Sequence, residues 1–141
     1  MEIKDHSPIP FIAMFKHPTR LYTTISGIFL LLQGSSTLVF RLVPALDRAF
    51  PALLATTMMV PSHSLLHILT GLLALAVLRW GGQRGADYFA LGFGLFYIGL
   101  ATFGTLTHQP TLFGLQPFDH PFHFLLGGLG VLAYGWAVKK R

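Results

Sequence analysis

Cysteine is absent from the sequence and charged residues are rare, and these two absences narrow the classes of function. Without cysteine the chain has no disulfide, no thiolate metal site and no cysteine nucleophile. Only 11% of the 141 residues are Asp, Glu, Lys or Arg, against roughly 25% in a typical soluble domain, while 52% are apolar. Because a soluble protein of this composition would expose apolar patches that associate, we expect lipid to be its solvent.

The formal net charge of +5 does not indicate a nucleic-acid-binding protein. The charges lie between apolar runs and at the two ends of the chain. They form no basic stripe, and they are not interleaved with aromatic residues as in nucleic-acid-binding surfaces. We therefore expect the lipid bilayer as the partner, and no nucleic acid.

Four apolar stretches are long enough to cross a bilayer, which takes about 20 helical residues. Their approximate bounds are residues 21–40, 63–80, 87–107 and 120–138. Because a segment in hydrocarbon must pair its backbone polar groups internally, each stretch is expected to be a helix. The predicted fold class is an all-α membrane protein, a bundle of four transmembrane helices.

Outside the four helices the sequence predicts an arm, a tail and three connections. Residues 1–20 are predicted to form a cytoplasmic and interfacial arm, and residues 139–141 a basic tail behind the four-helix domain at 21–138. The longest connection, residues 41–62, contains an apolar piece at 52–60 that we expect to pack on the bundle or lie in the interface.

Lysine and arginine predict the orientation, because these residues concentrate in cytoplasmic flanks. If the N-terminus is cytoplasmic, Arg41 and Arg48 lie outside. The other basic residues then lie inside: Lys4, Lys16, Arg20, Arg79, Arg84, Lys139, Lys140 and Arg141. This bias predicts a multi-pass protein with both termini in the cytoplasm.

An internal repeat relates the two halves of the chain. The second and fourth spans begin with a polar residue, a histidine four residues later and a glycine four residues after that: His63, His67 and Gly71, then Asp119, His123 and Gly127. The first and third spans share a fragment that starts at Gly27 and at Gly94. The repeat predicts two tandem helical hairpins related by an axis along the membrane normal, with the second and fourth helices starting at the same face.

These residues resemble the bacterial membrane proteins catalogued as domain of unknown function 4383. The resemblance covers residues 21–138 and is carried by the run from His63 to Gly71 and by its echo at Asp119, His123 and Gly127. It implies a four-helix protein of the bacterial inner membrane, and it implies no established activity.

Histidines gather on the predicted outer side, where they suggest a metal site. His63 and His67 lie four residues apart, so on a helix they share a face and can bind one ion together, and Asp119 and His123 repeat this spacing. Three imidazoles and one carboxylate suit zinc, iron, manganese or copper. Two further outer histidines are expected as reserve or outer-shell ligands: His120 and His108.

A structural interpretation of the same residues stays open. Asp119, which lies two residues before Pro121, would be the N-cap of the fourth helix, and Ser62 or Ser64 would cap the second. The histidines would then bond only to water and lipid. In this interpretation the third helix mediates assembly with a second copy or another membrane protein through its glycines, which are Gly92, Gly94, Gly99 and Gly104.

Two further interpretations rank lower. In the first, His67 and His123 are paired axial ligands of a haem, and Gly71 and Gly127 leave room for the porphyrin. In the second, the metal activates water for a membrane hydrolase, with Asp47 as the spare general base. No sequence feature specifies a substrate, so an enzyme is not favoured.

Overall fold

Helices account for most of the residues that the computed structural model describes, which are 17–52, 55, 59–107 and 114–140. The elements in chain order are α2 (Pro18–Leu42), α3 (Pro44–Ala49), α5 (Pro61–Trp80), α6 (Gly82–Thr107) and α7 (Asp119–Lys139). The predicted arm before residue 17 and most of the predicted apolar piece at 52–60 lie outside the described residues, as does the connection at 108–113.

Four of these helices, α2, α5, α6 and α7, are long and apolar enough to cross a membrane. This confirms the all-helical fold class and the four apolar spans. The short helix α3, which was not predicted, occupies part of the connection between the first two spans. Exposed leucines cover the outside of the bundle, as a lipid-facing surface requires, for example Leu32, Leu69, Leu106 and Leu132.

Proline and glycine define where the helices begin and turn. Pro18, Pro44 and Pro61 occupy the first position of α2, α3 and α5, where the missing N–H costs no hydrogen bond. The backbone reverses between α5 and α6 at Gly81 and Gly82, and the φ of +59° at Gly82 favours glycine. Helix α6 therefore starts five residues before the predicted span, and the connection is reduced to Gly81.

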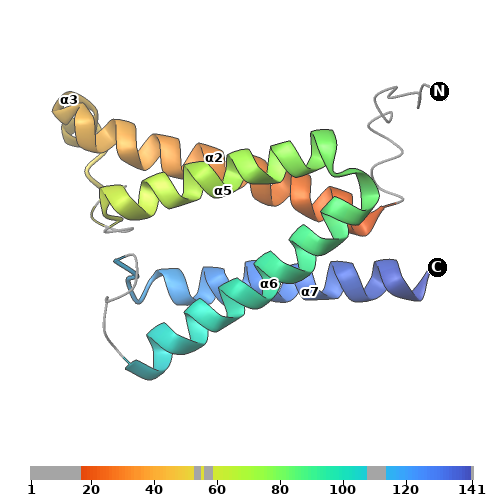
Figure 1. Cartoon of the computed structure of the whole chain (residues 1–141). Helices are drawn as coiled ribbons and strands as arrows, with labels where there is room; N and C mark the ends of the chain where they lie inside the picture. Colours follow the sequence, from red (N-terminus) through yellow and green to blue (C-terminus); the bar gives the residue numbers. More distant parts are fainter. Residues whose placement is uncertain (1–16, 53–54, 56–58, 108–113, 141) are drawn as a thin grey trace.

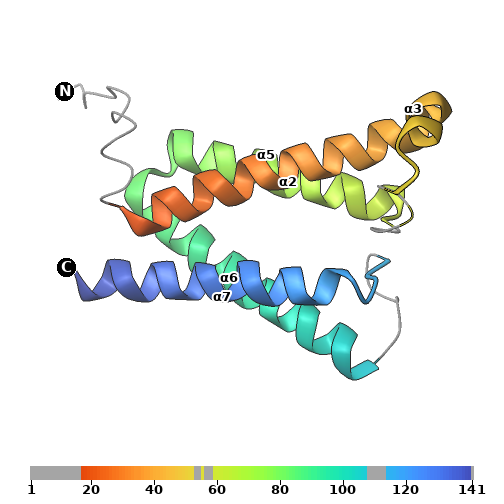
Figure 2. The same cartoon turned by 180° about the vertical axis from the view of Figure 1, so that it is seen from behind.

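The helices pack as two pairs, α2 with α5 and α6 with α7 (Figures 1 and 2). In each pair the helices approach closely at equivalent glycines. A Cβ added at Gly71 would lie 2.8 Å from the carbonyl oxygen of Gly27, and one added at Gly127 would lie 2.7 Å from that of Gly94. These are the glycines of the predicted repeat, so both halves use the same contact between small residues.

Both pairs have the same direction in the bundle. Helices α5 and α7 begin at one end of the molecule, whereas α2 begins and α7 ends at the opposite end (Figure 1). An apolar core between the pairs includes Leu30, Phe93 and Tyr97. The two starts that carry the repeated histidine pattern are therefore neighbours.

Candidate metal centre

Three histidines from two helices meet inside the bundle at the end where α5 and α7 begin. His63 and His67 come from the first two turns of α5, and His123 comes from the second turn of α7. Their exposed fractions are 1%, 3% and 3%. Each offers one ring nitrogen to a group whose ligand atoms all lie within 4.8 Å of one another.

The imidazole rings surround a common point. The Nε2 atoms of His63 and His67 are 3.1 Å apart, and their ring centroids are separated by 4.5 Å. The His123 ring lies 6.0 Å from that of His63 and 6.5 Å from that of His67. The spacing of four residues on α5 brings the first two rings together, and the packing of α7 beside the bundle supplies the third.

Several ring nitrogens in this group lack a hydrogen bond. The Nδ1 atoms of His63, His67 and His123 are buried without a hydrogen-bond partner among the described residues. A buried polar atom without a partner costs free energy, on the order of 1–3 kcal/mol. The histidine cluster is therefore a site whose polar atoms are not fully satisfied by the protein around it.

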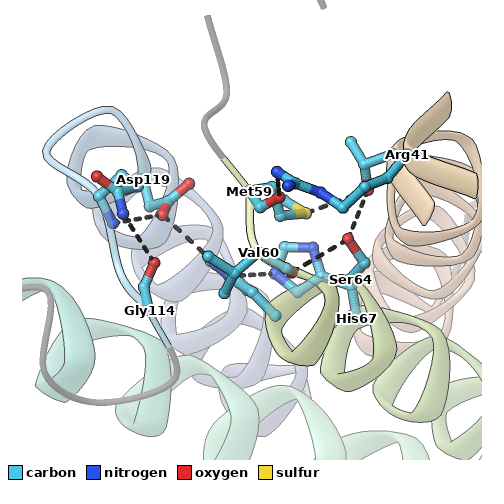
Figure 3. A network of polar contacts seen from close by, with 10 residues as sticks. Arg41, Met59, Val60, Ser64, His67, Gly114 and Asp119 are labelled. Atoms are coloured by element: carbon cyan, nitrogen blue, oxygen red, sulfur yellow. Dashed lines mark hydrogen bonds and ion pairs between the residues drawn. The ribbon is translucent and has the colours of Figure 1, made fainter. Parts of the chain in front are cut away.

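Asp119 lies beside the cluster rather than within the group of three. Its Oδ2 is 3.6 Å from Nδ1 of His63, on the opposite side of the ring from the nitrogen that faces His67. The same oxygen accepts a hydrogen bond of 2.8 Å from the backbone N–H of Gln116. Figure 3 shows Asp119 in the polar network that reaches Ser64 and Arg41 on the other helix pair.

The chain matches the family described as Domain of unknown function (DUF4383) over residues 20–138. It belongs to this family. No curated protein and no solved structure shows significant similarity to it. The resemblance expected from the repeated histidine pattern is confirmed, and the description of DUF4383 names no activity.

The capping roles expected for the polar residues of this DUF4383 chain are wrong. Phe118, not Asp119, is the N-cap of α7, and no side chain makes a capping hydrogen bond there. The N-cap of α5 is Val60, again without a side-chain bond. Ser64 instead contacts Thr37 of α2, with 2.9 Å between the two hydroxyl oxygens. Proline at the first position of α5 leaves one N–H fewer to cap.

The structure describes only one of the two histidines expected as reserve ligands, His120. His120 lies against α6, where its ring fills the space that a Cβ at Gly104 would occupy. It is outside the group of three ligands, although its buried Nδ1 also lacks a partner among the described residues. His108 falls outside the part of the chain that the structure describes.

The glycine argument for haem binding is wrong, because both glycines are already in contact with another helix. A Cβ at Gly71 would lie 2.6 Å from Leu31, and a Cβ at Gly127 would lie 2.8 Å from Ile98. No room for a porphyrin remains beside either residue. The general base suggested for a hydrolase, Asp47 on α3, is not part of the described ligand group.

Sequence reasoning missed Tyr97 of α6, which forms one wall of the cluster. Its ring lies edge-on to His123 with 4.6 Å between centroids, and only 2% of the residue is exposed. Tyr97 stands in the middle of an apolar run, so its neighbours in the sequence give no sign of this contact. The repeat offers one signal: Tyr97 follows Gly94 by three residues, as the buried Leu30 follows Gly27.

Proposed function

We propose that this DUF4383 chain is a multi-pass protein of the bacterial inner membrane that binds one transition metal ion through His63, His67 and His123. The observation that carries the proposal is the convergence of three buried imidazoles, with all ligand atoms within 4.8 Å. The Nε2 atoms of His63 and His67, 3.1 Å apart, support it, because both are placed to bind one ion.

The distances agree with the size of a zinc site. Zinc–nitrogen bonds of about 2.0–2.1 Å at a tetrahedral angle place two ligand nitrogens roughly 3.3–3.4 Å apart. The Nε2 atoms of His63 and His67, at 3.1 Å, are already close to that separation. The widest pair, at no more than 4.8 Å, would need to close by at most about 1.4 Å when the ion binds.

The chemistry of the ligands orders the candidate metals. Imidazole nitrogen suits zinc, copper and iron, whereas manganese favours carboxylate and water oxygens. Because the close group consists of imidazoles alone, zinc and copper rank before iron, and manganese ranks last. Three protein ligands leave one tetrahedral position for water or another small ligand.

Asp119 has a supporting role in this proposal. Histidines that bind a metal commonly donate their other ring N–H to a carboxylate, which fixes the tautomer and strengthens the ligand. Nδ1 of His63 faces Oδ2 of Asp119 at 3.6 Å, so a small rotation makes this hydrogen bond while Nε2 stays toward the metal. Gln116 holds the carboxylate in place through its backbone N–H.

The proposed orientation puts both chain ends in the cytoplasm and the metal site near the outer face. The bias in lysine and arginine supports it, and the start of α2 and the end of α7 lie at the same end of the bundle (Figure 2). A reporter that is active only in the cytoplasm, fused after Arg141, should be active; an inactive reporter with normal protein levels contradicts the orientation.

Metal content tests the proposal directly. Detergent-purified protein, stripped with chelator and dialysed against zinc, should retain one equivalent, and cobalt in its place should give the d–d absorption of a tetrahedral site. His67→Gln should lose both signals. His17→Gln, which changes an exposed histidine at the start of α2, should keep them. Equal metal retention by wild type and His67→Gln contradicts the proposal.

A structural and assembly role is the second candidate, and two observations favour it. The 3.1 Å separation of the His63 and His67 Nε2 atoms is also that of a hydrogen bond. On α6, Gly92 and Gly99 have open space where a Cβ would lie, which leaves this face free for a second copy or another membrane protein. This candidate predicts no metal retention, and a change of oligomer size when Gly99 becomes leucine.

A further inference from the structure

A groove runs between α2 and α7 at the end of the bundle opposite the histidines. Its volume is about 960 Å³, at the upper end of the ~300–1,000 Å³ common for ligand pockets. Its lining is apolar along most of its length, with Leu21 and Ile25 on α2 and Leu129 and Leu132 on α7. An apolar groove of this size between two membrane-spanning helices suits hydrocarbon.

The floor of the groove offers no free polar group to a ligand. The hydroxyl of Tyr22 donates to the carbonyl oxygen of Leu126 at 2.8 Å, which joins α2 to α7 across the floor. Ser26, which also lines the groove, is only 1% exposed. Along its floor, the groove must therefore recognise a ligand by shape and apolar contact.

One end of the groove is basic. Lys139 lines it directly, and the ammonium of Lys140 lies 4.8 Å above the ring of Trp136, another lining residue. No acidic side chain is among the described lining residues. Lysines at the end of a transmembrane helix lie at the depth of lipid headgroups and attract anionic ones.

We propose that the groove between α2 and α7 binds one anionic phospholipid, with an acyl chain along the apolar floor and the phosphate beside Lys139 and Lys140. Charge complementarity selects the lipid, and the length of the apolar groove holds it. The site is separate from the histidine cluster, because α7 has His123 near its start and Lys139 at its end.

Two glycines of α7 provide a matched pair of variants. Gly135 lines the groove and Gly128 does not, and neither has an atom within 4 Å of an added Cβ. The Cβ of a leucine at either position therefore meets no clash, and leucine raises helix propensity. Gly135→Leu fills the groove, whereas Gly128→Leu places the same side chain outside it.

The test uses full-length protein reconstituted in vesicles of equal parts phosphatidylglycerol and phosphatidylcholine, extracted in mild detergent and weighed by native mass spectrometry. Wild type should retain one phosphatidylglycerol in preference to phosphatidylcholine. Gly135→Leu should lose most of the retained lipid and Gly128→Leu should keep it. Lys139→Gln with Lys140→Gln should lower the preference for phosphatidylglycerol by about fivefold per lysine.

Three results overturn the proposal. The first is wild-type protein that retains both lipids equally or neither. The second is the same lipid retention in Gly135→Leu and Gly128→Leu, with both variants folded by circular dichroism. The third is a wild-type dimer that Gly135→Leu converts to monomers, which would assign the groove to a second copy of the chain. If Gly135→Leu fails to fold, the preference of the Lys139→Gln, Lys140→Gln double variant for phosphatidylglycerol decides whether the proposal stands.

Discussion

Adding a single methyl group at Gly127 should loosen the contact between α6 and α7. A Cβ there would lie 2.7 Å from the carbonyl oxygen of Gly94, 2.8 Å from the side chain of Ile98 and 2.9 Å from its backbone nitrogen. Ordinary contact begins at 3.4 Å, so the helices must separate by up to about 0.7 Å at this point. Two of these three atoms are backbone, so side-chain rotation cannot relieve the overlap.

Gly128→Ala is the matched control, because an added Cβ there has no atom within 4 Å. Overpacking in a tight interface costs about 1–3 kcal/mol. Both variants gain helix propensity, at most about 1 kcal/mol each, so this gain cancels in the comparison. We therefore expect Gly127→Ala to be less stable than Gly128→Ala by about 1–3 kcal/mol in free energy of unfolding.

Equilibrium unfolding in mixed detergent micelles, followed by far-UV circular dichroism, measures this difference. The Gly127→Ala variant should also bind zinc more weakly, because Gly127 is one turn after His123 and a displaced α7 moves that ligand. Equal unfolding midpoints for the two alanine variants would refute the close glycine contact. Equal stability together with weaker zinc binding would locate the effect at the metal site instead.

Two other substitutions have defined outcomes. Tyr22→Phe removes the hydroxyl that donates to the Leu126 carbonyl and should cost about 1 kcal/mol of unfolding free energy, whereas Tyr88→Phe, at an exposed tyrosine, should change it little. Asp119→Asn keeps the shape of the side chain but weakens the support of His63, so zinc affinity should fall about 10–100-fold while the unfolding midpoint of the metal-free protein stays near that of wild type.

The number and type of the helices could be predicted from the sequence because lipid imposes a simple requirement. A span needs about 20 apolar residues and an internally paired backbone, and the sequence displays both. The helix ends were harder to predict, because a helix can extend beyond the apolar run. Helix α6 extends back to Gly82, where Gln83 and Asp87 share a hydrogen bond of 2.9 Å inside the bundle.

The candidate site was predictable where the spacing on one helix decides the contact. A separation of four residues brings His63 and His67 together on α5 without knowledge of any other helix. The repeat then indicated that α7 would contribute to the same end of the molecule. The rotation of α7 about its axis decides whether Asp119 or His123 faces the cluster, and the sequence does not show this rotation. In the structure His123 belongs to the group of three, and Asp119 lies on the outer side of His63.

The sequence did not predict the contacts that Tyr97 and the buried carboxylate of Asp87 make with other helices. Asp87 is the first residue of the predicted third span, and its neighbours in the sequence indicated no partner for it. In the structure it accepts a hydrogen bond of 2.6 Å from the hydroxyl of Thr19, which lies 68 residues earlier in the chain. Such contacts depend on how α6 packs against α2 and α7, and the local sequence pattern contains no record of that packing.

X-ray absorption of the zinc-loaded protein in detergent tests the central claim most directly, because it reports the atoms bound to the metal. The proposal predicts three imidazole nitrogens at about 2.0–2.1 Å and one further light ligand for each zinc. A first shell made only of oxygen, or a spectrum left unchanged when His67 and His123 are replaced by glutamine, would show that the buried histidines do not bind the ion.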